Sequence, residues 1–149
     1  MIDLHPPASG LPLASVLLLC AAEALSCLGR SREAGETLRT SAVIACVVSV
    51  IAAFSSGYQA SSRALSLTVE AQDAVAFHHA LGKGLLATTL LLGTFYYLSR
   101  AATQGKRAFY FVYLGVLLLQ LIGTIWVGTL GGRLVFEHGV NVSCQAPAS

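Results

Sequence analysis

The chain contains four long runs of apolar residues separated by short polar segments, and these runs limit its fold more than any other feature. Each run has about 20 residues, the length that a helix needs to cross the hydrocarbon core of a bilayer. The composition agrees, since 55% of the residues are apolar and 11% are charged. The sequence therefore predicts one domain, residues 1–149, with four transmembrane helices. These lie at residues 11–28, 38–58, 75–98 and 107–130.

The pattern within the runs predicts an all-α fold. None of them alternates apolar and polar residues with the period of two that marks a strand of a membrane barrel. Only helices and closed barrels satisfy their own backbone hydrogen bonds in lipid. We therefore expect an up-down bundle of four helices with short loops. The residues before the first run include Asp3 and no basic residue, unlike a signal peptide, so the first helix is expected to be retained.

The basic residues predict how the helices are oriented. Lysine and arginine near helix ends are retained on the cytoplasmic side of a membrane. Six of the nine basic residues lie beside the first or the third connection: Arg30, Arg32, Arg39, Arg100, Lys106 and Arg107. We therefore expect both termini to lie outside the cytoplasm.

All four histidines, His5, His78, His79 and His138, fall on the predicted outer side. Two imidazoles that face each other across a helical bundle are the usual axial ligands of b-type haem, which needs no covalent attachment motif. These residues are therefore candidate haem ligands near the outer face. The alternative is an ordinary hydrogen-bonding role at helix ends.

The spacing along straight helices counts against one shared iron. At 1.5 Å per residue, His138 lies about 14 Å farther out than His78 or His79. A bend at Gly131 and Gly132 is needed to bring the histidines level. Because apolar residues follow these glycines, we expect a short interfacial C-terminal cap that lays His138 over the outer end of the bundle.

A divalent metal such as zinc or copper is another candidate ligand for the imidazoles, with Glu137 as a further donor. The spacing of these residues matches no compact metal motif. Arg133 and Glu137 are four residues apart and are expected to form a structural ion pair if this segment is helical.

Three segments resemble a known family. "LHPP" at residues 4–7, "HHALG" at residues 78–82 and "GGRLVFEHGV" at residues 131–140 are similar to the domain-of-unknown-function 2231 family, small four-helix membrane proteins of bacteria. The resemblance covers nearly the whole chain and implies a bacterial inner membrane, with no activity assigned. Members usually carry a second histidine in a His-Phe-Pro setting, where this chain has Gly10 before Leu11.

Polar residues within the runs predict contacts between helices. Glu23 lies about 10 Å inside the cytoplasmic end of the first helix, where a carboxylate needs a partner, water or a proton. We expect it to contact an arginine or a hydroxyl inside the bundle, and a proton relay is the alternative. Gln120 and Thr124 share one helix face and are expected to hydrogen-bond to another helix. Lys83 is expected to extend to the outer headgroups.

Small and aromatic residues predict how the helices pack. Two stripes of small residues with four-residue spacing favour close approach of another helix: Ala45, Ser49, Ala53 and Gly57, and then Gly128 and Gly132. The aromatic residues around the third connection are expected to be interfacial anchors: Tyr96, Tyr97, Phe109, Tyr110 and Tyr113.

The sequence has no motif of a nucleotide-binding loop, a nucleophilic serine, a zinc protease or a nucleic-acid module. Two classes remain. One is an accessory or scaffolding subunit that contacts the lipid bilayer and other membrane subunits. The other is an electron-transfer protein that holds haem b or a metal and meets a periplasmic electron carrier. An intermolecular disulfide through Cys144, alone on the outer side, is also left open.

Overall fold

The structure, a computed structural model, describes residues 9–27, 32–61, 68–138 and 140. Within these residues it is helical and contains no strand, so the predicted all-α class is confirmed. The helices are α2 (Leu11–Cys27), α3 (Arg32–Ser61), α4 (Val69–Ala101) and α5 (Lys106–Phe136).

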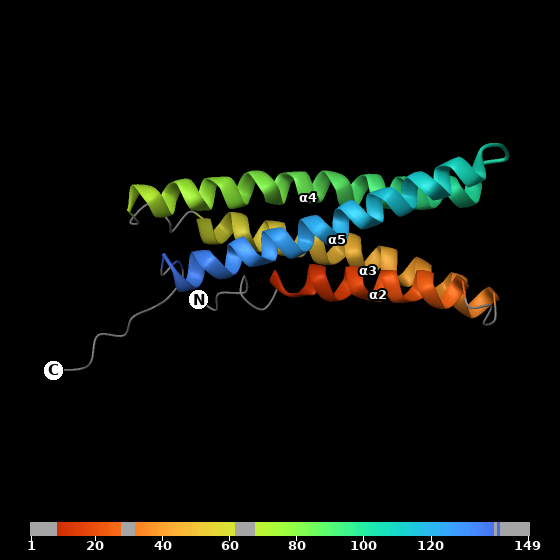
Figure 1. Cartoon of the computed structure of the whole chain (residues 1–149), viewed down its shortest axis with the longest axis horizontal. Coiled ribbons are helices and arrows are strands. Elements are labelled where there is room, and N and C mark those ends of the chain that lie inside the picture. The colour runs from red at the N-terminus through yellow and green to blue at the C-terminus, as the bar shows by residue number, and fades with distance from the viewer. Residues whose placement is uncertain (1–8, 28–31, 62–67, 139, 141–149) are drawn as a thin grey trace.

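The four helices lie side by side along the long axis of the molecule (Figure 1). Contacts join α2 to α3, α3 to α4, α4 to α5 and α5 back to α2, and the pair α4 and α5 has the largest contact. The helix α2 is the shortest, with 17 residues. At the end of the molecule where α2 begins, the other three helices therefore extend past it (Figure 1).

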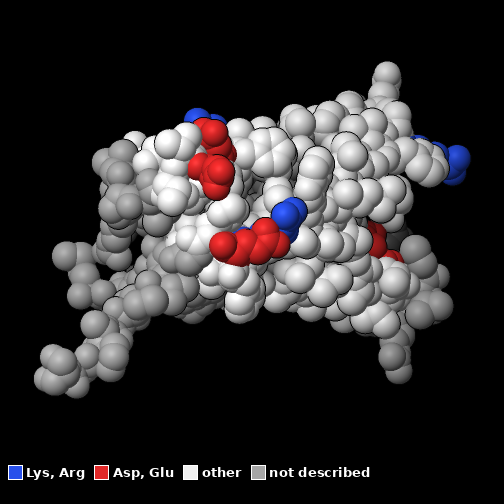
Figure 2. Space-filling view, turned by 60° about the vertical axis from the view of Figure 1, so that its left-hand side comes forward, with Lys and Arg blue, Asp and Glu red and all other residues white. Residues whose placement is uncertain are grey.

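Three helical segments are long and apolar enough to cross a membrane: Ala34–Tyr58, Val69–Ala101 and Lys106–Phe136. The helix α2 is also apolar but shorter, and its 17 residues rise about 26 Å. Charged side chains cover only small areas of the face in Figure 2, and many large apolar residues are exposed. These are the helix lengths and the surface of a membrane protein.

The helices continue beyond the apolar runs into polar turns. The helix α4 begins at Val69, ahead of its apolar run, because Thr68 caps it by accepting a hydrogen bond from the amide of Ala71 at 3.4 Å. Glu70 in the first turn also favours this end, since a negative charge is stabilised at a helix N-terminus. Residues 102–105 connect α4 to α5, and Gly105 has φ of 71° in the left-handed region that favours glycine.

The expected C-terminal cap is wrong, because the segment belongs to α5. The helix continues through Gly131 and Gly132 to Phe136, and the amide of Glu137 donates to the carbonyl of Arg133 at 2.8 Å. Consecutive residues point about 100° apart around a helix, so successive apolar residues cannot all face the bundle. Leu134 is accordingly buried, whereas Phe136 is 90% exposed.

Candidate functional site

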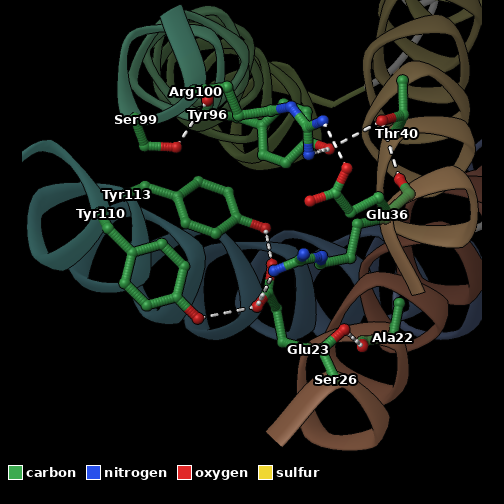
Figure 3. Close-up of polar contacts among 11 residues, drawn as sticks. Ala22, Glu23, Ser26, Glu36, Thr40, Tyr96, Ser99, Arg100, Tyr110 and Tyr113 are labelled. Carbon is green, nitrogen blue, oxygen red and sulfur yellow. Dashed lines mark hydrogen bonds and ion pairs between the residues drawn. The ribbon is translucent and has the colours of Figure 1, made fainter. Parts of the chain in front are cut away.

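A buried carboxylate on α2 joins three helices at the end of the bundle opposite the start of α2. Glu23 is 7% exposed. The hydroxyl of Tyr113 donates to its Oε1 at 2.8 Å, and the hydroxyl of Tyr110 donates to its Oε2 at 2.9 Å (Figure 3). Arg39 Nη1 on α3 lies 3.6 Å from Oε2. Glu23 therefore has both kinds of partner that its depth in the helix predicts, an arginine and a hydroxyl.

A second set of contacts joins α3 to α4 beside this carboxylate (Figure 3). The hydroxyls of Thr40 and Tyr96 are 2.7 Å apart, and Arg100 Nη2 donates to Glu36 Oε2 at 3.0 Å. The guanidinium of Arg100 lies 5.7 Å from the centre of the Tyr96 ring. The rings of Tyr96 and Tyr113 are 5.5 Å apart and link the two sets. We call the residues of both sets the tyrosine cluster: Glu23, Glu36, Arg39, Thr40, Tyr96, Arg100, Tyr110 and Tyr113.

The expectation that the tyrosines are interfacial anchors is wrong for two of them. Tyr113 is fully buried and Tyr96 is buried, because both contact the polar groups inside the bundle. Tyr97 is 66% exposed, in keeping with an anchor. The sequence does contain a signal for the burial of Tyr113. It lies four and seven residues before two other buried residues of α5, Leu117 and Gln120, and such spacing marks one helix face.

The middle of the bundle is held by an amide. Gln120 on α5 is fully buried, its Nε2 donates to Thr89 at 2.7 Å, and its Oε1 accepts from Thr88 at 2.6 Å. This is the contact between helices expected for Gln120. The hydroxyl of Thr124 instead donates to the carbonyl of Gln120 on its own helix at 2.7 Å.

The other end of the bundle contains a cavity of about 700 Å³ with walls from all four helices. We call it the outer cavity, after the side of the membrane predicted for it. Apolar and glycine residues form most of its walls, among them Leu13, Phe54, Gly57, Gly128 and Val135. No aspartate, glutamate, lysine or arginine is among its described lining residues.

Two histidines of α4 line the outer cavity. His79 Nε2 lies 3.3 Å from the carbonyl oxygen of Gly57 on α3, and its ring centre is 6.2 Å from that of Phe54. His78 packs against α5 at Gly131, where an added Cβ would lie 3.2 Å from Cε1 of the imidazole. A glycine at this position therefore allows the two helices to approach with the imidazole between them.

Of the candidate haem ligands, the structure places His78 and His79 in the wall of the outer cavity. His138 is exposed and is not among the residues that line the outer cavity, and His5 lies outside the described residues. Within the described part of the chain, no group of three histidine, cysteine, aspartate or glutamate residues is suited to a metal ion. Cys144 also lies outside that part.

Arg133 and Glu137 form the ion pair that a helical segment predicts. Arg133 Nε donates to the two carboxylate oxygens of Glu137 at 2.9 and 3.1 Å, on the exposed surface. This hydrogen bond lowers the pKa of the Glu137 carboxyl below its ordinary value. Lys83 is exposed, as expected for a side chain that extends to headgroups.

The small-residue stripes have different outcomes. In α3, Ser49 is buried and its hydroxyl lies 2.8 Å from that of Ser15 on α2, which agrees with close packing there. The stripes can serve packing within the bundle or contact with another subunit, and in α5 no helix of the bundle packs on Gly128 or Gly132, since no heavy atom beyond their own helix lies within 4 Å of an added Cβ. Both glycines line the outer cavity, and the contact with α4 occurs at Gly131.

Comparison of the chain with protein-family models, with curated proteins and with solved structures finds no match. The assignment of a function therefore rests on the tyrosine cluster, the outer cavity and the exposed helix faces.

Proposed function

We propose that this protein is an accessory subunit of a membrane complex in a bacterial inner membrane and performs no catalysis of its own. The observation that carries the proposal is the pairing of its buried polar side chains. Glu23, Gln120 and Ser15 are buried, and each hydrogen-bonds to a side chain of another helix. Groups that act in acid–base or nucleophilic chemistry have to reach a substrate, whereas these groups hold helices together.

In this proposal α2 also crosses the membrane, so that it forms an up-down bundle of four spans together with α3, α4 and α5. Both termini then face away from the cytoplasm. A helix of about 26 Å is close to the bilayer core thickness of about 30 Å. Basic residues beside the connection between α4 and α5 favour a cytoplasmic position for it: Arg100, Lys106 and Arg107. The resemblance to the domain-of-unknown-function 2231 family supports the same arrangement.

A partner helix has a suitable contact surface on α4. Ala76, Ala80 and Gly84 recur every four residues and are all exposed. Small residues at this spacing let a second helix approach closely, which matters in lipid because apolar surface alone does not drive helices together there. An added Cβ at Gly84 meets no heavy atom within 4 Å, so a larger side chain is accommodated by the isolated subunit.

The test is the size of the assembly that the chain forms in its own membrane. In a mild detergent the protein should migrate on a native gel in a complex larger than the chain with its micelle. Gly84→Leu should release it from this complex. Gly115→Leu is the matched control, since Gly115 is an exposed α5 glycine that also has no neighbour within 4 Å. Migration of the unaltered chain alone in the mildest detergent would contradict the proposal.

A second candidate is a protein that holds b-type haem through one axial imidazole. The observation that favours it is the position of His78 and His79 in the wall of the outer cavity. A reduced-minus-oxidised absorption spectrum of the purified protein tests it, since bound haem gives a Soret band and an α-band. A featureless visible spectrum after incubation with haem and removal of the unbound haem would remove this candidate.

A further inference from the structure

The outer cavity has the size and composition of a site for a neutral ligand. Its volume of about 700 Å³ lies within the range of about 300–1,000 Å³ found for small-molecule sites. Burying a charged group without a partner of opposite charge is costly. Since no lysine, arginine, aspartate or glutamate is among the described lining residues, a phosphate or carboxylate group has no partner there. This argues against a phospholipid headgroup and against the two propionates of haem.

The polar groups of the outer cavity suit oxygen atoms on a ring. A carbonyl oxygen only accepts hydrogen bonds, so His79 Nε2 carries the proton that Gly57 accepts. A neutral imidazole that donates through Nε2 accepts through Nδ1, which gives a ligand hydroxyl an acceptor on His79. The Thr129 hydroxyl in the lining donates to the carbonyl of Ile125 at 2.9 Å and keeps its lone pairs as acceptors. His78 supplies a second imidazole, which donates to a ring carbonyl or accepts from a ring hydroxyl according to its tautomer.

The α5 wall of the outer cavity suits a flat group. Gly128 and Gly132 both line it, and the space beside each backbone is open because neither has a neighbour within 4 Å of an added Cβ. Glycine backbone without side chains lets a ligand approach closely. Ile125 and Phe136 line the cavity and are also 51% and 90% exposed, so its wall is continuous with the outer apolar surface.

From these observations we infer that the outer cavity binds the head ring of a membrane quinone or quinol. The ring lies along the glycine wall, its oxygens meet the imidazoles of His78 and His79, and its apolar tail leaves beside Phe136 toward lipid. The inference concerns binding alone and does not depend on the partner subunit proposed above.

The chain contains its own reporter for this binding. Trp126 is the single tryptophan, and it lies between Ile125 and Val127, both of which line the outer cavity. Quinones quench indole fluorescence at short range. Titration of the purified full chain with a decyl-tailed benzoquinone should therefore give saturable quenching. Quenching by quinone dissolved in the micelle rises without saturation, and a purely linear response would overturn the inference.

Two leucine variants test where the quinone binds. Gly128→Leu places a side chain in the cavity where no other atom blocks it, so the fold is retained and the ring is displaced. Its apparent dissociation constant should rise by about tenfold or more. Gly115→Leu, on the same helix and away from the lining, should bind as the unaltered protein does. Equal affinity of the Gly128→Leu variant and the unaltered protein would overturn the inference.

An alkyl compound that lacks the quinone ring tests whether the cavity recognises the ring or the tail. Decanol has the same alkyl tail as the probe, and at equal concentration it should leave the quenching almost unchanged. Displacement of the quinone by decanol with equal effect would overturn the inference, because the cavity would then take any alkyl chain. Haem that displaces the quinone and develops a Soret band would also overturn it, in favour of the haem candidate.

Discussion

Glu23 shows how a carboxylate is stabilised within an apolar bundle. Two tyrosine hydroxyls donate to it, one to each oxygen, and the guanidinium of Arg39 lies 3.6 Å away. A buried charge is costly unless it is paired and hydrogen-bonded, and these three groups meet both conditions. The carboxylate in turn fixes Tyr113, which has no exposed surface.

Tyr113→Phe should lower the stability of the protein by removing one donor to the carboxylate. Hydrogen bonds to charged groups contribute about 1.5–3 kcal/mol, and those between membrane helices about 1–2 kcal/mol or less, so we expect a loss of about 1–2 kcal/mol. Tyr97→Phe is the control, because Tyr97 is 66% exposed. Thermal unfolding in detergent measures both variants, and equal melting temperatures would refute a stabilising role for the Tyr113 hydroxyl.

Replacement of Glu23 separates shape from charge. Glu23→Gln keeps an oxygen that accepts a tyrosine hydrogen bond and should be tolerated with a small loss. Glu23→Leu leaves the Tyr113 hydroxyl and the Arg39 guanidinium without this partner, and it should cost about 3–5 kcal/mol, as for removal of one member of a buried pair. If both variants have the same melting temperature as the unaltered protein, the carboxylate does not stabilise the bundle.

The exposed pair at the end of α5 predicts a pH dependence. The hydrogen bond from Arg133 lowers the pKa of Glu137, so the folded helix favours the charged carboxylate. The stabilisation by this pair is therefore present above the ordinary glutamate pKa and is lost as the pH falls through the lowered one. An NMR titration should find the Glu137 midpoint below that of an ordinary glutamate, and Arg133→Gln should raise it. An unchanged midpoint in the variant would mean that the pair is absent in solution.

The number and type of the elements followed from the sequence, whereas their ends did not. A run of about 20 apolar residues has to be a helix in lipid because its backbone has no other hydrogen-bond partners. Beyond such a run, side-chain caps and tertiary contacts determine where the helix begins and ends. At Thr68, for example, a side-chain cap starts α4 in a polar segment. Gly131 and Gly132 are compatible with a bend and with a helix, so the sequence alone did not fix the position of His138.

The contact between α4 and α5 predicts a moderate effect of replacing its central amide. Gln120→Leu removes both side-chain hydrogen bonds to α4. The carbonyl of Leu85 lies within hydrogen-bond distance of both threonine hydroxyls, so Thr89 keeps this acceptor and Thr88 can donate to it once the amide is gone. We expect a loss of about 1 kcal/mol, smaller than for Glu23→Leu. A loss as large as that of Glu23→Leu, measured by the same thermal unfolding, would contradict this reasoning.

The outer cavity is a property of the whole molecule and has no signature in any one segment. Its lining residues come from α2, α3, α4 and α5, and it lies at the end of the bundle where α3, α4 and α5 continue past the start of α2 (Figure 1). The predicted topology placed His78 and His79 at this end of the bundle. The glycines Gly128 and Gly132, which line the cavity, were expected to pack against another helix. Which helix covers a glycine depends on tertiary packing, which a single sequence does not display.

The arrangement of the whole chain in the membrane predicts opposite locations for two reporter fusions. Arg100, Lys106 and Arg107 flank the connection between α4 and α5, and the retention of such residues favours the proposed cytoplasmic position of this connection. A reporter inserted at Gly105 should therefore be active as a cytoplasmic enzyme, and one fused after Ser149 should report the opposite side. Replacement of Lys106 and Arg107 by glutamine should weaken the preference without changing the helices. Cytoplasmic signals from both fusions would refute the proposed topology. Exchanged signals, with Ser149 in the cytoplasm and Gly105 outside, would invert the orientation and place the outer cavity on the cytoplasmic side, while leaving its proposed ligand chemistry unchanged.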